Sequence, residues 1–213
     1  MAERRGVFVS VDGGDGVGKS TQLDLLLPWL RQCGHDVTAC RDPGSTPLGE
    51  AIRQIVLHRH DLVIHRRAEM LLYMAARAQL VEEVIRPALE QGRTVVSDRY
   101  LLANVVYQGY GGGLDVEELW RVGSTAVAGV MPDVVLLLDV PPEVAQLRIG
   151  RPLDRMESQG DEFRRRVREG FLAEAARKPE HILVVDASRS VDEVQASMRS
   201  LLDGWLQRRR GQR

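Results

Sequence analysis

A glycine-rich stretch near the start of the chain, "DGGDGVGKST", contains residue types that can bind phosphate. Its spacing is Gly13-x-x-x-x-Gly18-Lys19-Ser20, and glycines let the backbone approach an anion closely and adopt positive φ. The N–H groups of such a loop converge on phosphate oxygens, and the N-terminus of a following helix adds to the attraction. Lys19 would then reach the β- and γ-phosphates, and the Ser20 hydroxyl would bind Mg²⁺. The alternative is a glycine turn that arose by chance.

The segments on either side favour the phosphate loop. "GVFVSV" before it has the pattern of a buried strand, and "STQLDLLLPWLRQ" after it has the pattern of a helix. Lys19 is also one of only two lysines in a chain whose other basic residues are arginines. We therefore expect a nucleoside triphosphate to bind here. The predicted loop contacts are Gly13, Gly14, Asp15, Gly16, Val17, Gly18, Lys19, Ser20 and Thr21.

A second group of polar residues follows the strand predicted at 93–98, in "SDRYLLANVVYQGYGGGLD". Asp98 and Arg99 place opposite charges at the carboxyl end of that strand, where ligands gather in parallel sheets. A helix that begins just after them puts Asn104, Tyr107 and Gln108 on one face. The alternative is an ordinary strand cap with an Asp–Arg pair and a polar outer helix face.

A basic stretch, "LRIGRPLDRMESQGDEFRRRVREGF", lies between the last two predicted strands. Arg148, Arg151 and Arg155 occur there among glycine, proline and aspartate, which predicts a short mobile lid at about residues 148–160. Phosphoryl transfer spreads negative charge over the moving group, so arginines delivered by a lid would stabilise the transition state. A solvated helix face is the better interpretation of "FRRRVRE" alone.

Short apolar strands alternate with amphipathic helices along the chain. Strands are predicted at 6–11, 36–40, 93–98, 132–140 and 182–187, and helices at 20–32, 48–57, 66 to near Pro87, and 191–208. This alternation predicts an α/β fold in which a five-stranded parallel sheet has helices on both faces. We expect residues 1–213 to form one domain, with the candidate functional stretches at the carboxyl edge of the sheet.

Composition excludes several classes of protein. A chain of 213 residues that is 44% hydrophobic can bury a large core, and a net charge of -1 argues against a general nucleic-acid binder. Cys33 and Cys40 lack disulfide-framework or metal-ligand spacing and are expected to be free thiols. No signal peptide and no apolar run of 18 residues is evident. We expect a cytoplasmic protein with no membrane or nucleic-acid partner.

Taken together, these stretches resemble the bacterial-type thymidylate kinases, from about Gly6 to Ala187. "DGGDGVGKST" is similar to the phosphate loop of that family, and "RDPGSTPLGEAIR" to its R-E-P-G-G-T segment. "SDRYLLANVVYQG" resembles D-R-Y…A-Y-Q-G, and "LDRMESQGDEFRRRVREGF" resembles D-R-x-E…F-x-x-V-R-x-x-Y. The resemblance implies a P-loop nucleoside monophosphate kinase fold, a homodimer, and phosphorylation of dTMP to dTDP with ATP and Mg²⁺ in dTTP biosynthesis.

The resemblance also implies roles around the nucleotide base. Tyr73 matches the aromatic residue that stacks on thymine, and Arg77 matches the arginine that bonds the carbonyl edge of the base. Their i,i+4 spacing fits this pair of roles, although "LLYMAARAQL" read alone indicates core packing. Asn104 matches a position near the base edge in some members. Tyr107 matches the tyrosine whose ring crowds the sugar 2′ position.

At the phosphates, the resemblance places Arg99 on the acceptor phosphate and Asp15 on the sugar 3′-hydroxyl. Arg41 and Asp42 would lie near the acceptor phosphate, and Asp98 near Mg²⁺ through water. The full predicted dTMP site is Asp15, Arg41, Asp42, Tyr73, Arg77, Arg99, Asn104, Tyr107 and Gln108.

Catalysis in this arrangement would rest on charge. Gly16 stands where some members, chiefly eukaryotic ones, carry a loop arginine, so the lid arginines are expected to clamp the phosphates instead. Lys19, Arg99, Arg151 and Arg155 are the predicted catalytic residues, and Arg148 is a reserve lid arginine on the ATP side.

Four residues depart from the family pattern. Asp42 replaces the usual glutamate and, being shorter, is expected to reach its partner through water. Ser45 replaces a glycine, which is harmless only if its φ is negative. Ala103 replaces a common serine, and Gly112 a common arginine.

Two other functions stay open at this point. The chain could be a kinase for another nucleoside monophosphate or a deoxynucleoside. It could also be a nucleotide-dependent switch, although the fourth strand ends "LLLDVPPE", without the N-K-x-D segment that reads guanine.

Overall fold

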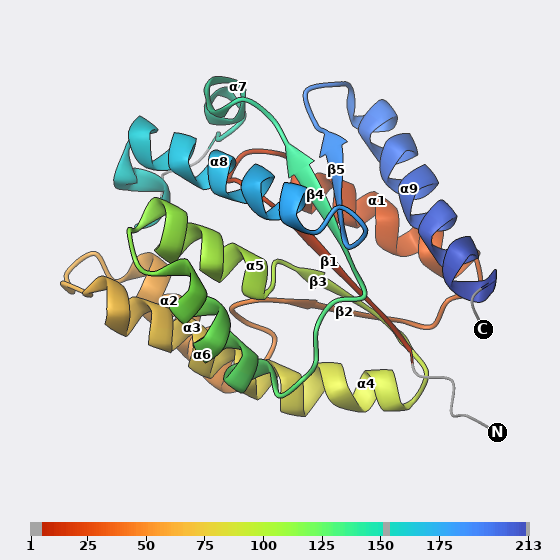
Figure 1. Cartoon of the computed structure of the whole chain (residues 1–213), viewed down its shortest axis with the longest axis horizontal. Coiled ribbons are helices and arrows are strands. Elements are labelled where there is room, and N and C mark those ends of the chain that lie inside the picture. The colour runs from red at the N-terminus through yellow and green to blue at the C-terminus, as the bar shows by residue number, and fades with distance from the viewer. Residues whose placement is uncertain (1–5, 151–153, 212–213) are drawn as a thin grey trace.

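The computed structural model describes residues 6–150 and 154–211 of the chain, and it contains one five-stranded parallel sheet with helices on both faces (Figure 1). The strands are β1 (Val7–Gly13), β2 (Val37–Arg41), β3 (Thr94–Asp98), β4 (Val134–Asp139) and β5 (Ile182–Asp186). They lie in the order β2-β3-β1-β4-β5. The predicted fold class is confirmed, and each predicted strand agrees with the structure to within two residues.

The strands are apolar on both sides because helices cover both faces of the sheet. In β1, Val9 and Val11 face one layer of helices and Phe8 faces the other, and all three are buried. In β4, Leu136 and Leu137 likewise pack on opposite faces. This burial agrees with the strand order, in which β1 is the central strand and β4 lies beside it.

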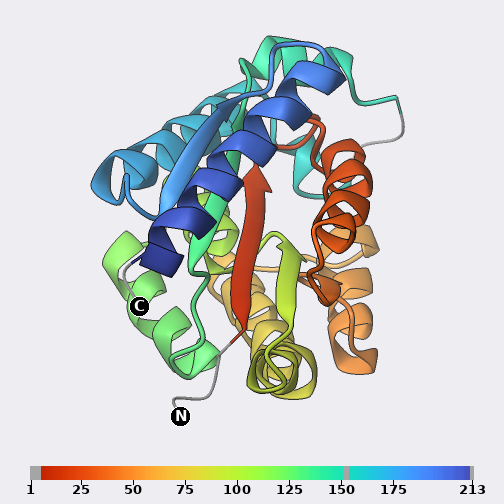
Figure 2. The same ribbon diagram turned by 90° about the vertical axis from the view of Figure 1, so that its right-hand side faces the viewer.

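Two helices cover one face of the sheet (Figure 2). They are α1 (Lys19–Gln32) and α9 (Val191–Gly211), which pack against each other as well as against the strands. Leu26 and Leu30 of α1 and Met198 and Leu202 of α9 are almost completely buried in this layer.

The other face carries more helices. They are α2 (Pro47–His58), α3 (Arg66–Leu80), α4 (Arg86–Glu90), α5 (Leu101–Asn104), α6 (Val116–Val127) and α8 (Asp161–Arg177). Leu102 of α5 and Phe171 of α8 are among the buried residues that close this layer over β4. Between β4 and α8 the chain forms a short helix α7 (Pro142–Leu147) and a 3-10 turn η3 (Glu157–Gln159).

Two π-helical turns interrupt the helices. The first, η1 (Val81–Ile85), joins α3 to α4, so the helix predicted to end or turn near Pro87 continues to Glu90. A proline lacks the N–H that bonds to the carbonyl four residues earlier, and the wider π turn before Pro87 changes that register. The second, η2 (Val105–Gly111), continues α5 and contains Tyr107 and Gln108.

Within the described residues, no helix is both long enough and apolar enough to cross a bilayer.

Candidate active site

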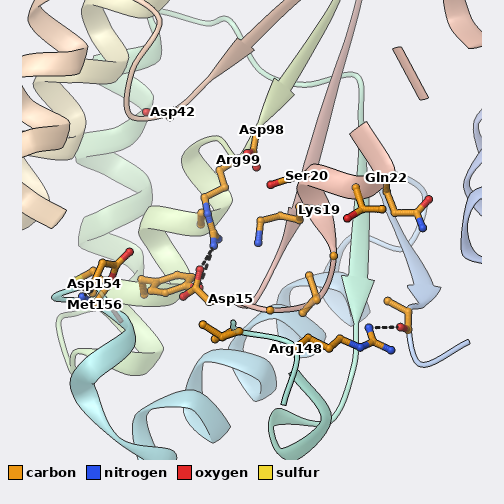
Figure 3. Close-up of a pocket in the computed structure, with 18 of the residues that line it drawn as sticks. Asp15, Lys19, Ser20, Gln22, Asp42, Asp98, Arg99, Arg148, Asp154 and Met156 are labelled. Atoms are coloured by element: carbon orange, nitrogen blue, oxygen red, sulfur yellow. Dashed lines mark hydrogen bonds and ion pairs between the residues drawn. The ribbon is translucent and has the colours of Figure 1, made fainter. Parts of the chain in front are cut away.

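A cavity of about 700 Å³ opens at the carboxyl ends of the strands (Figure 3). Lys19, Ser20 and Arg148 line one end of it, and Tyr73 and Arg77 line the other. Most of the predicted site residues therefore lie around one space. Those that line it are Asp15, Gly16, Val17, Gly18, Lys19, Ser20, Thr21, Asp42, Tyr73, Arg77, Asp98, Arg99, Asn104, Tyr107, Gln108 and Arg148.

The glycine loop joins the end of β1 to the start of α1 and packs tightly against its neighbours. Gly13 has φ +143°, and a Cβ atom there would lie 2.4 Å from the carbonyl oxygen of Leu138. A Cβ on Gly16 would lie 2.2 Å from the carbonyl oxygen of Ala145. Side chains at these positions would push the loop away from β4 and α7. The glycines thus hold the loop backbone in place beside the cavity.

Lys19 begins α1 and its side chain turns back over the loop. The ammonium group donates to the carbonyl oxygens of Gly13, at 3.2 Å, and Gly14, at 2.6 Å. Burial, together with the nearby charge of Arg99, lowers the pKa of Lys19 to about 8. This brings the titration of Lys19 close to neutral pH.

Ser20 and Asp98 are the residues predicted to hold Mg²⁺, and both line the cavity near Lys19. The Asp98 Oδ1 atom is buried and has no hydrogen-bond partner among the described residues. Among the described residues as a whole, no group of three or more histidine, cysteine or acidic side chains could bind a metal. Mg²⁺ commonly uses one or two protein oxygens with phosphates and water. Ser20 and Asp98 fit an ion of that kind.

Arg99 lies at the middle of the cavity, directly after β3. It has φ +67°, and its backbone N–H donates to the carbonyl oxygen of Val11. Its guanidinium donates to the carbonyl oxygen of Gly13 at 2.8 Å and to Asp15 Oδ1 at 2.5 Å. The Tyr107 hydroxyl donates to Asp15 Oδ2 at 2.7 Å. Asp15 therefore connects the phosphate loop to β3 and η2.

The far end of the cavity holds a buried arginine. Arg77 Nε donates to Asp42 Oδ2 at 2.5 Å, and its Nη1 donates to Asn104 Oδ1 at 3.0 Å. The expectation that Asp42 would reach its partner through water is wrong for Arg77, whereas its position near the acceptor phosphate stays a prediction, since Asp42 lines the cavity. Both side chains are buried between α3 and the end of β2, and there Asp42 contacts Arg77 directly.

Arg41 is not brought to the cavity. Its side chain is half exposed and makes a two-pronged ion pair with Glu50. Arg53 of α2 lines the cavity instead, and its Nη1 donates to the carbonyl oxygen of Pro43 at 3.0 Å. The sequence did offer a signal for Arg53, because it is the last residue of the family-like segment "RDPGSTPLGEAIR".

The three lid arginines differ in position. Arg148 donates to the carbonyl oxygen of Ala187 at 2.8 Å and lines the Lys19 end of the cavity. Arg151 lies outside the described residues. Arg155 does not line the cavity, because its backbone N–H and Nε bond to the carbonyl oxygens of Leu57 and Val56 and its guanidinium pairs with the buried Glu69. Arg155 is therefore an anchor to α2 and α3 here, which corrects its expected position beside the phosphates.

Several lining residues are absent from the predicted site, although Asp154 and Met156 belong to the quoted D-R-x-E segment. These lining residues come from the start of α1, the segment before α8 and the region around the start of α9: Gln22, Asp154, Met156, Ala187, Arg189, Ser190, Val191 and Val194.

Two of the departures from the family pattern have a clear position. Ser45 has φ +62°, so it does occupy a backbone conformation that favours glycine. Local bonds offset that strain, because Ser45 Oγ accepts from the Arg41 N–H and the Ser45 N–H donates to Glu50. Ala103 is buried and lines the cavity.

Comparison with known proteins agrees with this geometry. The family model described as thymidylate kinase matches residues 11–198. The thymidylate kinase of Leifsonia xyli subsp. xyli is 49% identical over 204 residues, which are 94% of this chain and 96% of that protein. That of Rhodopirellula baltica is 48% identical over 189 residues, 89% of this chain and 77% of that protein.

A solved structure is similar as well. The crystal structure of thymidylate kinase from Ehrlichia chaffeensis superimposes with a TM-score of 0.78 at 27% identity, covering 93% of this chain and 99% of that one. Sequence, fold and site geometry agree, and the chain belongs to the thymidylate kinase family.

Proposed function

We propose that this protein transfers the γ-phosphoryl group of ATP to dTMP and so forms dTDP for dTTP synthesis. Membership of the family supports this activity. The observation that carries the proposal is the continuous cavity, which joins a lysine-bearing phosphate loop to a pocket walled by Tyr73, Arg77 and Tyr107. Arg99 lies between the two ends, where the phosphates of donor and acceptor would meet.

The two substrates would bind at opposite ends of the cavity. ATP would place its phosphates on the loop, with Arg148 and the first residues of α9 beside the nucleoside. The dTMP base would lie against Tyr73 within reach of Arg77 and Asn104. The Tyr107 ring would crowd the sugar 2′ position. The Tyr107 hydroxyl donates to Asp15, which fixes the ring. This arrangement favours a deoxyribonucleotide over a ribonucleotide.

The reaction needs little covalent chemistry from the protein. The attacking oxygen of the acceptor phosphate is already anionic, so no general base is required. Positioned positive charge then provides most of the acceleration. Lys19 and Arg99 neutralise charge along the line of transfer. Ser20 and Asp98 would hold Mg²⁺, which would supply further positive charge to the phosphates.

A homodimer in the cytoplasm is the expected form of the enzyme. Exposed apolar side chains on neighbouring helices, Leu48 of α2 and Leu71 of α3, support an interface on this side of the molecule. Light scattering coupled to size exclusion would test the assembly, because a monomer at micromolar concentration would contradict it.

The activity is tested by ADP release measured with a panel of monophosphates: dTMP, dUMP, dCMP, AMP and GMP. The proposal expects the highest kcat/KM with dTMP. The highest value with another monophosphate would support the alternative kinase, and slow hydrolysis that ignores the acceptor would support a switch. Lys19→Ala, prepared in parallel, identifies any contaminating activity because it should lose turnover with every acceptor.

A further inference from the structure

A buried carboxylate lies behind the base end of the cavity, outside the predicted site. Glu69 of α3 has no exposed surface and does not line the cavity. Gln108 Nε2 donates to its Oε1 at 2.9 Å, and the Arg155 guanidinium donates to its Oε2. Arg66 Nη1 lies 3.5 Å from Oε1 on the more exposed side. Glu69 thus has donors on both of its oxygens.

Glu69 is one end of a chain of hydrogen bonds that leads to the base pocket. Gln108 Oε1 accepts from Asn104 Nδ2 at 2.7 Å, and Asn104 Oδ1 accepts from Arg77 Nη1 at 3.0 Å. Arg77 in turn donates to Asp42. This chain of five residues, the amide relay, therefore runs between two buried carboxylates. Each amide has one orientation that satisfies both of its neighbours.

We propose that Glu69 is a positioning residue that fixes the amide relay and thereby the specificity for the nucleotide base. The proposal rests on the proposed function, which places the base beside Arg77 and Asn104. A guanidinium can only donate hydrogen bonds, so a fixed Arg77 favours a base with a 4-carbonyl oxygen over one with a 4-amino group. Glu69 keeps Arg77 and Asn104 in that arrangement through Gln108.

A carboxylate is needed at position 69 because both of its oxygens accept. A glutamine there has one oxygen and one NH₂ group, so either Gln108 or Arg155 would face a donor. A buried donor that loses its acceptor carries the full cost of its desolvation. Glu69→Gln therefore disturbs the amide relay, the Arg155 contact or both, while it keeps the size of the side chain.

Arg155 connects the same carboxylate to a second wall of the cavity. Its neighbours Asp154 and Met156 line the cavity opposite Arg148 (Figure 3). Arg155 also donates to the Val56 carbonyl oxygen at 2.8 Å, which fixes it to the end of α2. Through Gln108 and Arg155, Glu69 therefore fixes the positions of Arg77 and Asn104 relative to the cavity wall formed by Asp154 and Met156.

The test compares Glu69→Gln with the unaltered enzyme. We expect KM for dTMP to rise by about tenfold or more, which is the scale of one buried hydrogen bond to a charged group, while KM for ATP changes less than about twofold. The ratio of Ki for dCMP, as a competitor of dTMP, to KM for dTMP should fall by about tenfold. Circular dichroism and thermal unfolding show whether the variant is folded.

Arg66→Gln is the matched control, because Arg66 also contacts Glu69 but lies outside the amide relay. It should leave KM for dTMP and the Ki ratio unchanged. A folded Glu69→Gln enzyme with an unchanged ratio, or with equal rises in both KM values, would overturn the proposal. Failure of the unaltered enzyme to phosphorylate dTMP would instead overturn the proposed function.

A second variant covers the case in which Glu69→Gln does not fold. Gln108→Met cuts the amide relay next to Glu69 and leaves the pair with Arg155 in place. The proposal expects the same fall in the Ki ratio, and an unchanged ratio in this variant also contradicts it.

Discussion

The Lys19 ammonium group is buried in the loop and its pKa is lowered to about 8, first by burial and then by Arg99. Only the protonated amine attracts phosphate, so ATP binding should require proton uptake once the pH passes this pKa. We expect affinity for ATP to fall between about pH 7.5 and about pH 9.5, by up to about tenfold per pH unit above the pKa. Calorimetric titrations of ATP in buffers of different ionisation enthalpy measure both the affinity and the proton uptake.

Lys19→Arg provides the control, since a guanidinium stays charged throughout this range. Its ATP affinity, whatever its absolute value, should not vary with pH in the same window. A pH profile that is flat in the unaltered protein would show that Lys19 does not titrate near 8.

Tyr107 offers a test of sugar recognition at the level of one side chain. Its ring packs at the cavity wall, and Arg99 lies 5.1 Å from the ring centre. If the ring excludes the 2′-hydroxyl, Tyr107→Ala should reduce the preference for dTMP over its ribose counterpart by about tenfold. Tyr107→Phe keeps the ring and loses only the hydrogen bonds of the hydroxyl, to Asp15 and from Arg99, so it should retain that preference. Equal ratios of kcat/KM in both variants would contradict the steric account.

At the scale of elements, the packing of α8 against η2 supports the Tyr107 side of the cavity. A Cβ atom on Gly170 of α8 would lie 2.5 Å from Cγ of Tyr110, so the Tyr110 side chain leaves no space for it. We expect Gly170→Ala to destabilise the protein by about 1 kcal/mol or more, as overpacked sites do. Denaturant unfolding measures the change.

Gly204 of α9 is the matched control for that substitution. It lies in a helix too, but the nearest atom to an added Cβ is the end of the Arg208 side chain at 3.6 Å. Gly204→Ala should therefore stabilise the protein by about 0.5–1 kcal/mol through helix propensity and unfolded-chain entropy. If both alanine variants shift stability in the same direction, the packing argument for α8 is incorrect.

Local pattern was sufficient to predict the strands and the phosphate loop. The strands are apolar runs bounded by turns. The loop is a short motif in which glycines are needed so that the backbone can approach a phosphate. The π turns η1 and η2 and the anchoring of Arg155 could not be predicted in this way. Arg155 is fixed by Glu69, 86 residues earlier in the chain, and no periodicity in either segment indicates that contact.

The same limit explains the corrections around β2. The family resemblance places both Arg41 and Asp42 near the acceptor phosphate. The backbone turns at the end of β2, and one side chain pairs with the exposed Glu50 while the other enters the core to meet Arg77. Motif resemblance located the segment correctly, whereas the direction of each side chain depended on its tertiary partners.

At the scale of the whole molecule, the strand order β2-β3-β1-β4-β5 accounts for the position of the site. The loops after β1, β2 and β3 lie next to one another, and β4 leads into the segment that carries Arg148 and Asp154. Charged residues from four separate stretches therefore meet at one edge of the sheet, which is the usual place for ligands in parallel sheets. A single cavity there can hold donor and acceptor end to end.

A crystal structure with dTMP and a non-hydrolysable ATP analogue tests this central claim most directly. The account predicts the triphosphate against Lys19 and Ser20, the dTMP phosphate at Arg99, and the pyrimidine between Tyr73 and Tyr107 with its 4-carbonyl oxygen facing Arg77. A pyrimidine bound elsewhere, or a triphosphate that does not contact the loop, would contradict it.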